Sequence, residues 1–247
     1  MERLILFDID GTLTRTENGY VPFNEAILQT FGCNGDIRTV VPDGNTDPLI
    51  VQDIFAKANL VFEFQDTTWE QFTINLRERY HHHVMQGTTR IRALPGTDAL
   101  LRALAANEKI CPSVVTGNFE ATAEIKLETA GLAPYLCRGA YASDSYLRAD
   151  LPAIAKARCE RITGSMLLAG QCIIIGDTPN DLQAATESHE VHTRRYRTLS
   201  DRRIALLGAG RLLSRSQRHR IGALDIDGTL EVKNAISNHW QNRLESF

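Results

Sequence analysis

Apolar residues along the chain gather in short runs that are separated by segments with helical spacing. Residues 3–8 form such a run, which ends in the carboxylate of Asp8 and leads into a glycine, as expected for a buried strand that opens into a turn. Short runs at residues 113–115, 139–141 and 172–175 predict three more strands. Strands that alternate with helices predict a parallel sheet wound on both faces by helices.

The segments between these strands predict the helices. Apolar residues recur there at spacings of three and four, which place them on one face of a helix. Pro112 precedes the second strand, and we place it at the first position of that strand, because proline cannot donate a hydrogen bond within a sheet. We expect helices at residues 98–107, 119–130 and 151–162, and one that begins at Pro179 with Thr178 as its cap.

Between Thr14 and Arg90 the pattern becomes helical, with three segments whose apolar residues recur at spacings of three and four. Glycines punctuate them and strand-like runs are scarce, so we expect a separate helical unit inserted after the first strand. The predicted fold is a doubly wound α/β core, formed by residues 1–15 and 91–190, with a helical cap formed by residues 16–90. Cap helices are expected at residues 22–31, 47–57 and 68–84.

Polar residues follow three of the predicted strands and point to a common site. Asp8 and Asp10 follow the first strand, Thr116 follows the second, and Asp177 follows the last. In an open parallel sheet these strand ends meet at one edge. Several carboxylates in one place need a cation, and we expect Mg²⁺, which binds one or two carboxylates together with water and phosphate oxygens.

The residues after the second strand indicate a site for phosphate. Thr116 offers a hydroxyl, and Gly117 allows a ligand to approach the backbone closely. The helix that follows Asn118 presents free N–H groups and the positive end of its dipole, which suits an anion.

Together these segments resemble the haloacid dehalogenase superfamily of aspartyl-phosphate hydrolases, and most closely its phosphoglycolate-phosphatase-like branch. The resemblance covers residues 3 to about 188 and rests on three motifs in the family's order. It implies a Rossmann-like core with an inserted cap, and a Mg²⁺-dependent phosphatase that acts on a small phosphorylated metabolite. The motifs are DIDGTLT from Asp8, VTGN from Val115 and IGDTPND from Ile175.

The resemblance also implies a role for each matching residue. Asp8 would attack phosphorus and bind Mg²⁺, and Asp10 would transfer protons while its backbone carbonyl joins the metal shell. Asp177 would be a further metal ligand. Dehalogenation is disfavoured, because family members with that activity lack the second Asp of the first motif. The transferring phosphoryl group would be held by Thr116, Gly117 and Asn118.

The family's third motif is a Lys, and its position here is open to two interpretations. Arg148 lies ahead of the last-motif strand and could bind phosphate through its guanidinium. Lys126 lies eight residues beyond Asn118, about 12 Å along a helix at 1.5 Å per residue, so we favour Arg148. Asp181 could support the metal or could cap the last helix together with Thr178, and both interpretations stay open.

In the expected cap, Gly44-Asn45-Thr46-Asp47 resembles the GxTD turn of this branch. The polar side chains of Asn45, Thr46 and Asp47 would then face the substrate and help to select it. The alternative is that Asn45 or Thr46 simply caps the following helix, and the sequence is equally compatible with both.

Residues 191–247 depart from the family pattern. Residues 191–220 contain nine Arg, no Lys and one Asp, whereas the whole chain has a net charge of −3. Residues 225–229 repeat DIDGT without the other motifs, so this copy cannot form a complete site. A basic arm, a solvated helix pair or a shift of reading frame near Glu187 would explain the segment, and the frame shift is our hypothesis. Nucleic acid is not favoured, because Tyr196 is the only aromatic residue among residues 191–220.

Composition excludes several other classes of protein. The chain of 247 residues is 43% hydrophobic and 23% charged, as in ordinary globular proteins. It has no apolar run near the roughly 20 residues of a membrane span and no secretory signal, so a cytoplasmic location is expected. Its five cysteines form no CxxC pair, which argues against a zinc knuckle. The alternative functions are a phosphomutase and an inactive, regulatory relative; the sequence indicates neither the substrate nor an oligomeric state.

Overall fold

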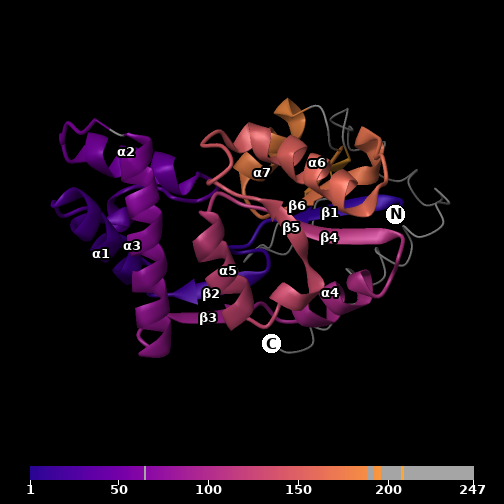
Figure 1. Cartoon of the computed structure of the whole chain (residues 1–247), viewed down its shortest axis with the longest axis horizontal. Helices are drawn as coiled ribbons and strands as arrows, with labels where there is room; N and C mark the ends of the chain where they lie inside the picture. The colour runs from indigo at the N-terminus through magenta and orange to yellow at the C-terminus, as the bar shows by residue number, and fades with distance from the viewer. Residues whose placement is uncertain (64, 189–191, 196–206, 209–247) are drawn as a thin grey trace, which may run out of the picture.

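The computed structural model describes residues 1–63, 65–188, 192–195 and 207–208, and it contains a sheet flanked by helices beside a separate group of helices (Figure 1). The strands of the sheet lie in the order β5-β4-β1-β6-β7-β8, and every neighbouring pair except β7–β8 is parallel. The predicted parallel α/β fold is confirmed. The strands are β1 (Arg3–Phe7), β4 (Ile110–Val115), β5 (Cys137–Ala140), β6 (Cys172–Ile175), β7 (His192–Arg195) and β8 (Leu207–Gly208).

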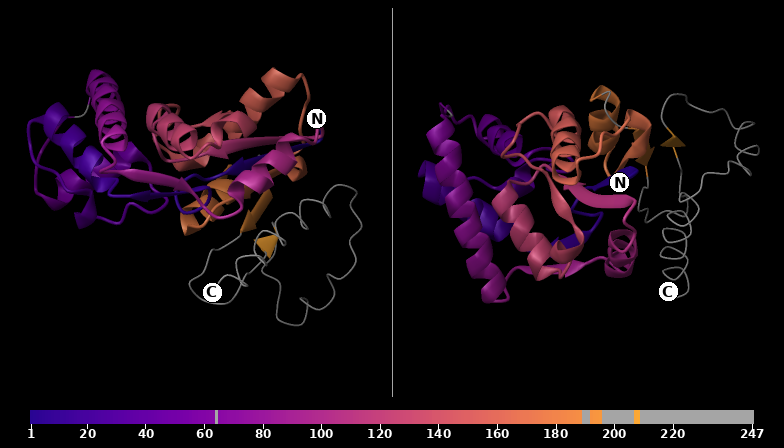
Figure 2. Two further views of the ribbon diagram at one scale, coloured as in Figure 1. Left: turned by 90° about the horizontal axis from the view of Figure 1, so that it is seen from below. Right: turned by 45° about the vertical axis from the view of Figure 1, so that its right-hand side comes forward.

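Helices cover both faces of the sheet, as the turned views show (Figure 2). Successive residues of a strand point to opposite faces, so Ile5 and Phe7 of β1 belong to one apolar cluster and Leu4 and Leu6 to another. The first cluster includes residues of α4 (Thr97–Ala105) and α5 (Glu120–Thr129). The second includes residues of α6 (Leu151–Thr163) and α7 (Pro179–Glu187).

Three helices, which we call the cap helices, stand apart from the sheet and have an apolar core of their own. This core is rich in aromatic rings: Phe23 and Phe72 pack edge to face with their centroids 5.6 Å apart, and Trp69 packs beside Phe72. Phe119 and Ile125 also belong to this core, so it extends to α5. The cap helices are α1 (Tyr20–Phe31), α2 (Asp47–Lys57) and α3 (Asp66–Met85).

Two short strands connect the cap helices to the sheet, and the sequence does not predict them. β2 (Thr14–Glu17) and β3 (Arg90–Ala93) form an antiparallel ribbon. These strands lie at the two ends of the segment in which the sequence indicated helices and few strands. Each strand buries a single residue, Thr14 and Ile91, so neither has the apolar run that marks a buried strand.

Two details of the sheet also differ from the prediction. Pro112 is the third residue of β4 rather than the first, and it is paired with Ile5 of β1. Pairing of β4 with β5 begins only at Ser113, so the proline lies where the strand has a partner on one side. β7 extends the sheet where the sequence indicated no strand, and residues 196–206 and 209–247 of the Arg-rich segment lie outside the described residues.

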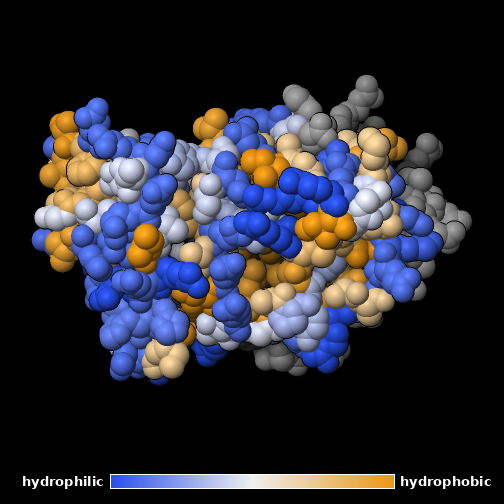
Figure 3. Space-filling model, viewed as in Figure 1, coloured by the Kyte–Doolittle hydropathy of each residue, from blue (hydrophilic) through white to orange (hydrophobic). Residues whose placement is uncertain are grey.

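Short 3₁₀ turns and one surface hollow complete the described structure. On the face shown in Figure 3 lies a hollow between α5 and β5, where a cavity of about 520 Å³ is lined by charged residues such as Glu124 and by apolar ones such as Leu127 and Leu136. No residue of the three motifs lines this hollow. The 3₁₀ turns are η1 (Ile37–Thr39), η2 (Ala133–Tyr135), η3 (Arg148–Asp150) and η4 (Ala169–Gln171).

Candidate active site

The three polar segments meet because β1 lies between β4 and β6 in parallel register. Phe7 is paired with Val114 on one side and with Ile175 on the other, so the residues that follow all three strands emerge together. They border a cavity of about 420 Å³, and Phe23 and Tyr80 of the cap helices line it from the other side. The cavity therefore lies between the sheet and the cap helices.

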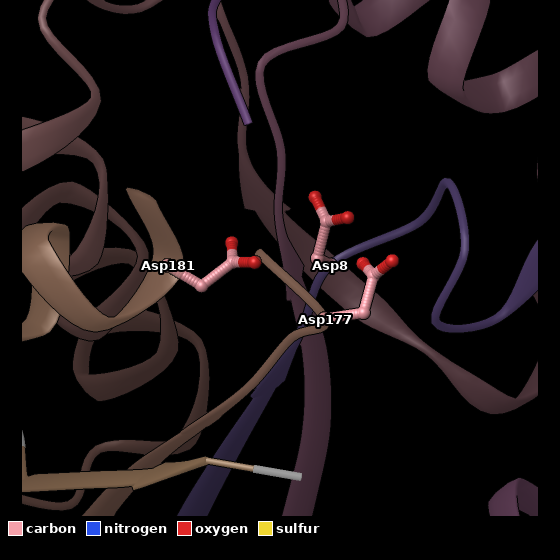
Figure 4. A group of neighbouring side chains, drawn as sticks. All are labelled: Asp8, Asp177 and Asp181. Atoms are coloured by element: carbon pink, nitrogen blue, oxygen red, sulfur yellow. The ribbon is translucent and has the colours of Figure 1, made fainter. Parts of the chain in front are cut away.

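Three carboxylates lie close together where β1 and β6 end and α7 begins (Figure 4). Asp8 follows β1, Asp177 follows β6 and Asp181 lies in α7, and one oxygen of each lies within 4.8 Å of the others. Burial raises the pKa of Asp8 to about 8, and the negative charge of Asp181 adds to that rise. Burial also raises the pKa of Asp177. Three carboxylates so close together favour a bound cation, and their hard oxygen donors are of the kind that Mg²⁺ binds.

The turn after β1 places Asp177 in this group. Gly11 has a φ of +80°, and a Cβ on it would lie 2.3 Å from Asp177 Oδ2, so both the conformation and the space require glycine. Thr12 Oγ1 donates a hydrogen bond to Asp177 Oδ1 at 3.1 Å. The DIDGT motif therefore holds the carboxylate that arrives from β6.

Arg148 is the cation of the carboxylate group. Its Nη2 donates to Asp8 Oδ1 at 2.9 Å and also contacts Asp181 Oδ1. Although burial alone would lower the pKa of the guanidinium, these two carboxylates raise it. The structure therefore brings Arg148, and not Lys126, to Asp8.

The structure confirms that Asp181 caps the last helix, whereas its support of a metal ion stays a prediction. Its Oδ2 accepts hydrogen bonds from the Thr178 backbone N–H at 2.9 Å and from Thr178 Oγ1 at 2.7 Å, so it closes a capping box at the start of α7. Its other oxygen, Oδ1, contacts Arg148. One carboxylate thus fixes the helix end and belongs to the acidic group.

Asp10 has a different environment from Asp8. Its Oδ2 accepts hydrogen bonds from Lys126 Nζ at 2.6 Å and from Asn118 Nδ2 at 2.8 Å. Burial by itself would raise the pKa of Asp10, but the charge and hydrogen bond of Lys126 and the hydrogen bonds of Asn118 and Thr16 lower it. The Asp10 carboxylate is therefore paired with Lys126, and its place in the metal shell through the backbone carbonyl stays a prediction.

Lys126 reaches the site, contrary to the distance estimated from the sequence. Its Nζ donates to Asn118 Oδ1 at 2.7 Å. The estimate of about 12 Å is wrong because α5 begins only at Glu120, so Asn118 is not part of the helix. Side chains on a helix also lean toward its N-terminus, which carries the ammonium back to the loop.

The VTGN loop is packed as tightly as its sequence suggests. Thr116 is buried, and its Oγ1 accepts hydrogen bonds from the backbone N–H of Asn118 at 3.3 Å and from its Nδ2 at 2.8 Å. A Cβ on Gly117 would lie 2.0 Å from the carbonyl oxygen of Asn45, so only glycine lets the two backbones approach.

A family model of haloacid dehalogenase-like hydrolases matches residues 2–189. This span is more than half of the chain and contains every residue of the site just described. The chain belongs to the haloacid dehalogenase-like hydrolases.

Solved structures with the same fold include members described as phosphatases. The chain is 20% identical to a predicted phosphoglycolate phosphatase from Haemophilus somnus 129pt, with coverage of 79% of this chain and 84% of that one and a TM-score of 0.55. It is 19% identical to CbbY from Rhodobacter sphaeroides in complex with phosphate, with coverages of 86% and 94% and a TM-score of 0.59. No curated protein matches the chain. At these identities the structures show a shared fold.

In this haloacid dehalogenase-like hydrolase, the GNTD segment of the cap docks directly on the VTGN loop. The backbone N–H of Asp47 donates to the Gly117 carbonyl at 2.7 Å, and Asp47 Oδ2 accepts from the Phe119 backbone N–H at 2.9 Å. Thr46 Oγ1 donates to the Tyr146 carbonyl at 2.9 Å. Burial raises the pKa of Asp47 to about 6, although Lys126 opposes the rise.

The structure separates the three cap residues that the sequence grouped. Asn45 and Asp47 line the cavity, whereas Thr46 does not. The alternative role of Thr46 as a side-chain cap of α2 is wrong, because no cap hydrogen bond is formed and its hydroxyl points to Tyr146. Asn45 accepts a hydrogen bond from the Thr46 backbone N–H at 3.1 Å.

Sequence reasoning missed several residues of this hydrolase that line the cavity. Arg15 and Thr16 of β2 lie in a strand that was not predicted, and Tyr80 of α3 and Asp43 belong to no motif. The one signal that could have found Thr16 is its position just after DIDGTLT. None of the helices that the structure describes is both long and apolar enough to cross a membrane.

Proposed function

We propose that this hydrolase is a Mg²⁺-dependent phosphatase that cleaves a small phosphomonoester through a phosphate ester on Asp8. The observation that carries the proposal is the contact of Arg148 with Asp8 at 2.9 Å, in a group of three carboxylates of which Asp8 and Asp177 line the cavity. Within the described part of the chain, one cation beside three carboxylates leaves a negative site that a divalent cation would complete. One solved neighbour is described as a predicted phosphoglycolate phosphatase and another is in complex with phosphate, which supports the same proposal.

Mg²⁺ would be held by Asp8, Asp177 and the backbone carbonyl of Asp10, with Asp181 beside them, and when bound it neutralises charge on the carboxylates and the phosphoryl oxygens. Asp8 attacks phosphorus, and the ester bond to the leaving oxygen breaks. Arg148, Thr116 and the backbone at Gly117 hold the phosphoryl oxygens as charge develops on them. Asn45 and Asp47 lie where the rest of the substrate would meet the cap.

Asp10 carries the protons in this scheme. A bound phosphate adds negative charge near Asp10, which raises its affinity for a proton that it then gives to the leaving alkoxide. The ionised Asp10 next takes a proton from water, and the resulting hydroxide attacks the phosphorus of the Asp8 ester. Phosphate leaves, Asp8 is restored and Asp10 is protonated again, so the cycle balances.

The test is hydrolysis of p-nitrophenyl phosphate with and without Mg²⁺ by the full chain and by Asp8→Asn. We expect turnover that requires Mg²⁺ and falls at least about 1,000-fold in the variant, because no residual nucleophile replaces Asp8. Asp98→Asn, an exposed partner of Arg102 on α4, is the matched control and should retain activity. Full turnover by Asp8→Asn, or none by the folded native chain, would contradict the proposal and favour an inactive, regulatory relative.

A further inference from the structure

Lys126 is a buried ammonium that the proposed chemistry does not use. Its side chain is 6% exposed, and its Nζ makes short hydrogen bonds to Asp10 Oδ2 and Asn118 Oδ1. Asn118 Nδ2 donates in turn to Asp10 Oδ2. The three side chains therefore form a closed triangle in which each polar group has a partner from the other two.

This triangle treats the two oxygens of Asp10 differently. Oδ2 accepts both strong hydrogen bonds, from Lys126 and from Asn118. Among the residues that the structure describes, Oδ1 accepts only a long contact of 3.5 Å from Thr16 Oγ1, and Asp10 lines the cavity. Proton transfer to and from a substrate therefore falls to Oδ1, while Oδ2 fixes the orientation of the carboxylate.

The cap helices complete the surroundings of Lys126. The ring of Tyr80 in α3 lies under the ammonium, with 5.7 Å from Nζ to the ring centroid, and the Tyr80 hydroxyl is tied to the Gly19 carbonyl at 3.2 Å. The charge of Asp47 acts on the ammonium as well. An ammonium–carboxylate attraction is stronger where protein excludes water, so the hold on Asp10 depends on the cap helices being docked.

We propose that Lys126 is a positioning residue that aligns Asp10 for proton transfer when the cap is closed. The residue thereby couples cap docking to the acid–base step, while Arg148 serves the phosphoryl group. This inference rests on the proposed function. A purely structural ion pair would instead affect all substrates alike, and this difference decides the experiment.

The experiment compares two aryl phosphates of nearly the same shape. Nitrophenolate leaves without a proton, whereas the more basic phenolate of phenyl phosphate needs one from Asp10. We expect Lys126→Met to lower kcat/KM for phenyl phosphate about 100-fold, within the usual range for lost general acid catalysis, and to lower it less than about 5-fold for p-nitrophenyl phosphate. With Lys126→Met, nitrophenolate should also appear in a burst, because hydrolysis of the Asp8 ester becomes slow in this variant.

Three further variants complete the design. Lys109→Met, at an exposed lysine paired with Glu2, is the matched control and should behave like the native chain. Tyr80→Leu removes the ring from the cap side and should show the same selectivity between substrates, about 10-fold, since it weakens the hold on Asp10 without abolishing it. Asp10→Asn should lose activity with the same pattern as Lys126→Met.

The double variant Asp10→Asn/Lys126→Met keeps the inference testable if the single Lys126 variant fails to fold, because it leaves no unpaired buried charge. If Lys126 acts through Asp10, the double variant is no slower than Asp10→Asn. A further loss in the double variant, or equal losses for both substrates in Lys126→Met, would overturn the inference alone. Turnover that is absent in the native chain, or that survives in Asp8→Asn, would overturn the proposed function together with it.

Discussion

The docking of the cap on the VTGN loop predicts a specific effect of Gly117→Ala. The new Cβ would lie 2.0 Å from the Asn45 carbonyl oxygen, whereas real Cβ contacts stay beyond 3.0 Å. The clash lies between two backbones that belong to different parts of the molecule. The cap segment can therefore move away without any disruption of the sheet.

The geometry sets the size of the effect. A retreat of about 1 Å lengthens the Asp47 N–Gly117 O bond from 2.7 Å to beyond normal hydrogen-bond length. The neighbouring bond from the Phe119 N–H to Asp47 Oδ2 is lost with it. Two hydrogen bonds at about 1 kcal/mol each amount to about 2 kcal/mol against closure, or about a 30-fold fall in the closed population.

The assay is kcat/KM for p-nitrophenyl phosphate, with thermal unfolding as the check on the fold. We expect Gly117→Ala to lose about 30-fold in kcat/KM while the unfolding temperature changes little. Thr46→Val removes one docking hydrogen bond, from Thr46 to the Tyr146 carbonyl, without touching the phosphate loop, and should lose about 5-fold. Native kcat/KM in both variants would refute the reasoning that closure depends on these contacts.

Three other effects follow from the charges of the site. Burial raises the pKa of Asp47 to about 6 from an unfolded value of 3.8, so the folded state holds the proton more tightly and stability falls as pH rises between these values. The free energy of unfolding of Asp47→Asn in urea should therefore exceed that of the native chain by about 3 kcal/mol at pH 8 but not at pH 4. Mg²⁺ at about 100 times its Kd should stabilise the chain by about 2.7 kcal/mol in thermal unfolding, and Asp177→Asn should remove that shift. Arg148→Met leaves Asp8 and Asp181 without their cation and should lower the free energy of unfolding by about 3–5 kcal/mol at pH 8. Arg148→Lys keeps the charge and should lower it less. Equal losses in the two variants would show that the charge of Arg148 does not stabilise the chain.

The parts of the site that follow from strand register could be predicted from the sequence. Asp8, Thr116 and Asp177 each come directly after a strand, and parallel pairing alone brings them to one edge. Buried strands and amphipathic helices also have strong periodic signals, and α2 has the predicted bounds, 47–57. Such features depend on local pattern and on a small set of sheet topologies.

Contacts between the cap and the core could not be predicted in this way. The bond from Phe119 to Asp47 joins residues 72 positions apart, and its partners lie outside any strand pairing. β2 and β3 are short and polar, so their sequence resembles that of a loop. The reach of Lys126 depends on where α5 begins and on the direction of a long side chain, neither of which sequence spacing specifies.

The placement of the two cations explains why carboxylates two positions apart differ in character. Arg148 is shared between Asp8 and Asp181, so burial prevails and raises the pKa of Asp8 to about 8. Asp10 accepts hydrogen bonds from the ammonium of Lys126 and the side-chain amide of Asn118, and these lower its pKa. Because their surroundings shift the two pKa values in opposite directions, Asp8 and Asp10 are suited to different tasks, as nucleophile and as acid–base group. A divalent cation beside Asp8 would oppose the effect of burial and lower the pKa, and the same carboxylate would then be an ionised nucleophile.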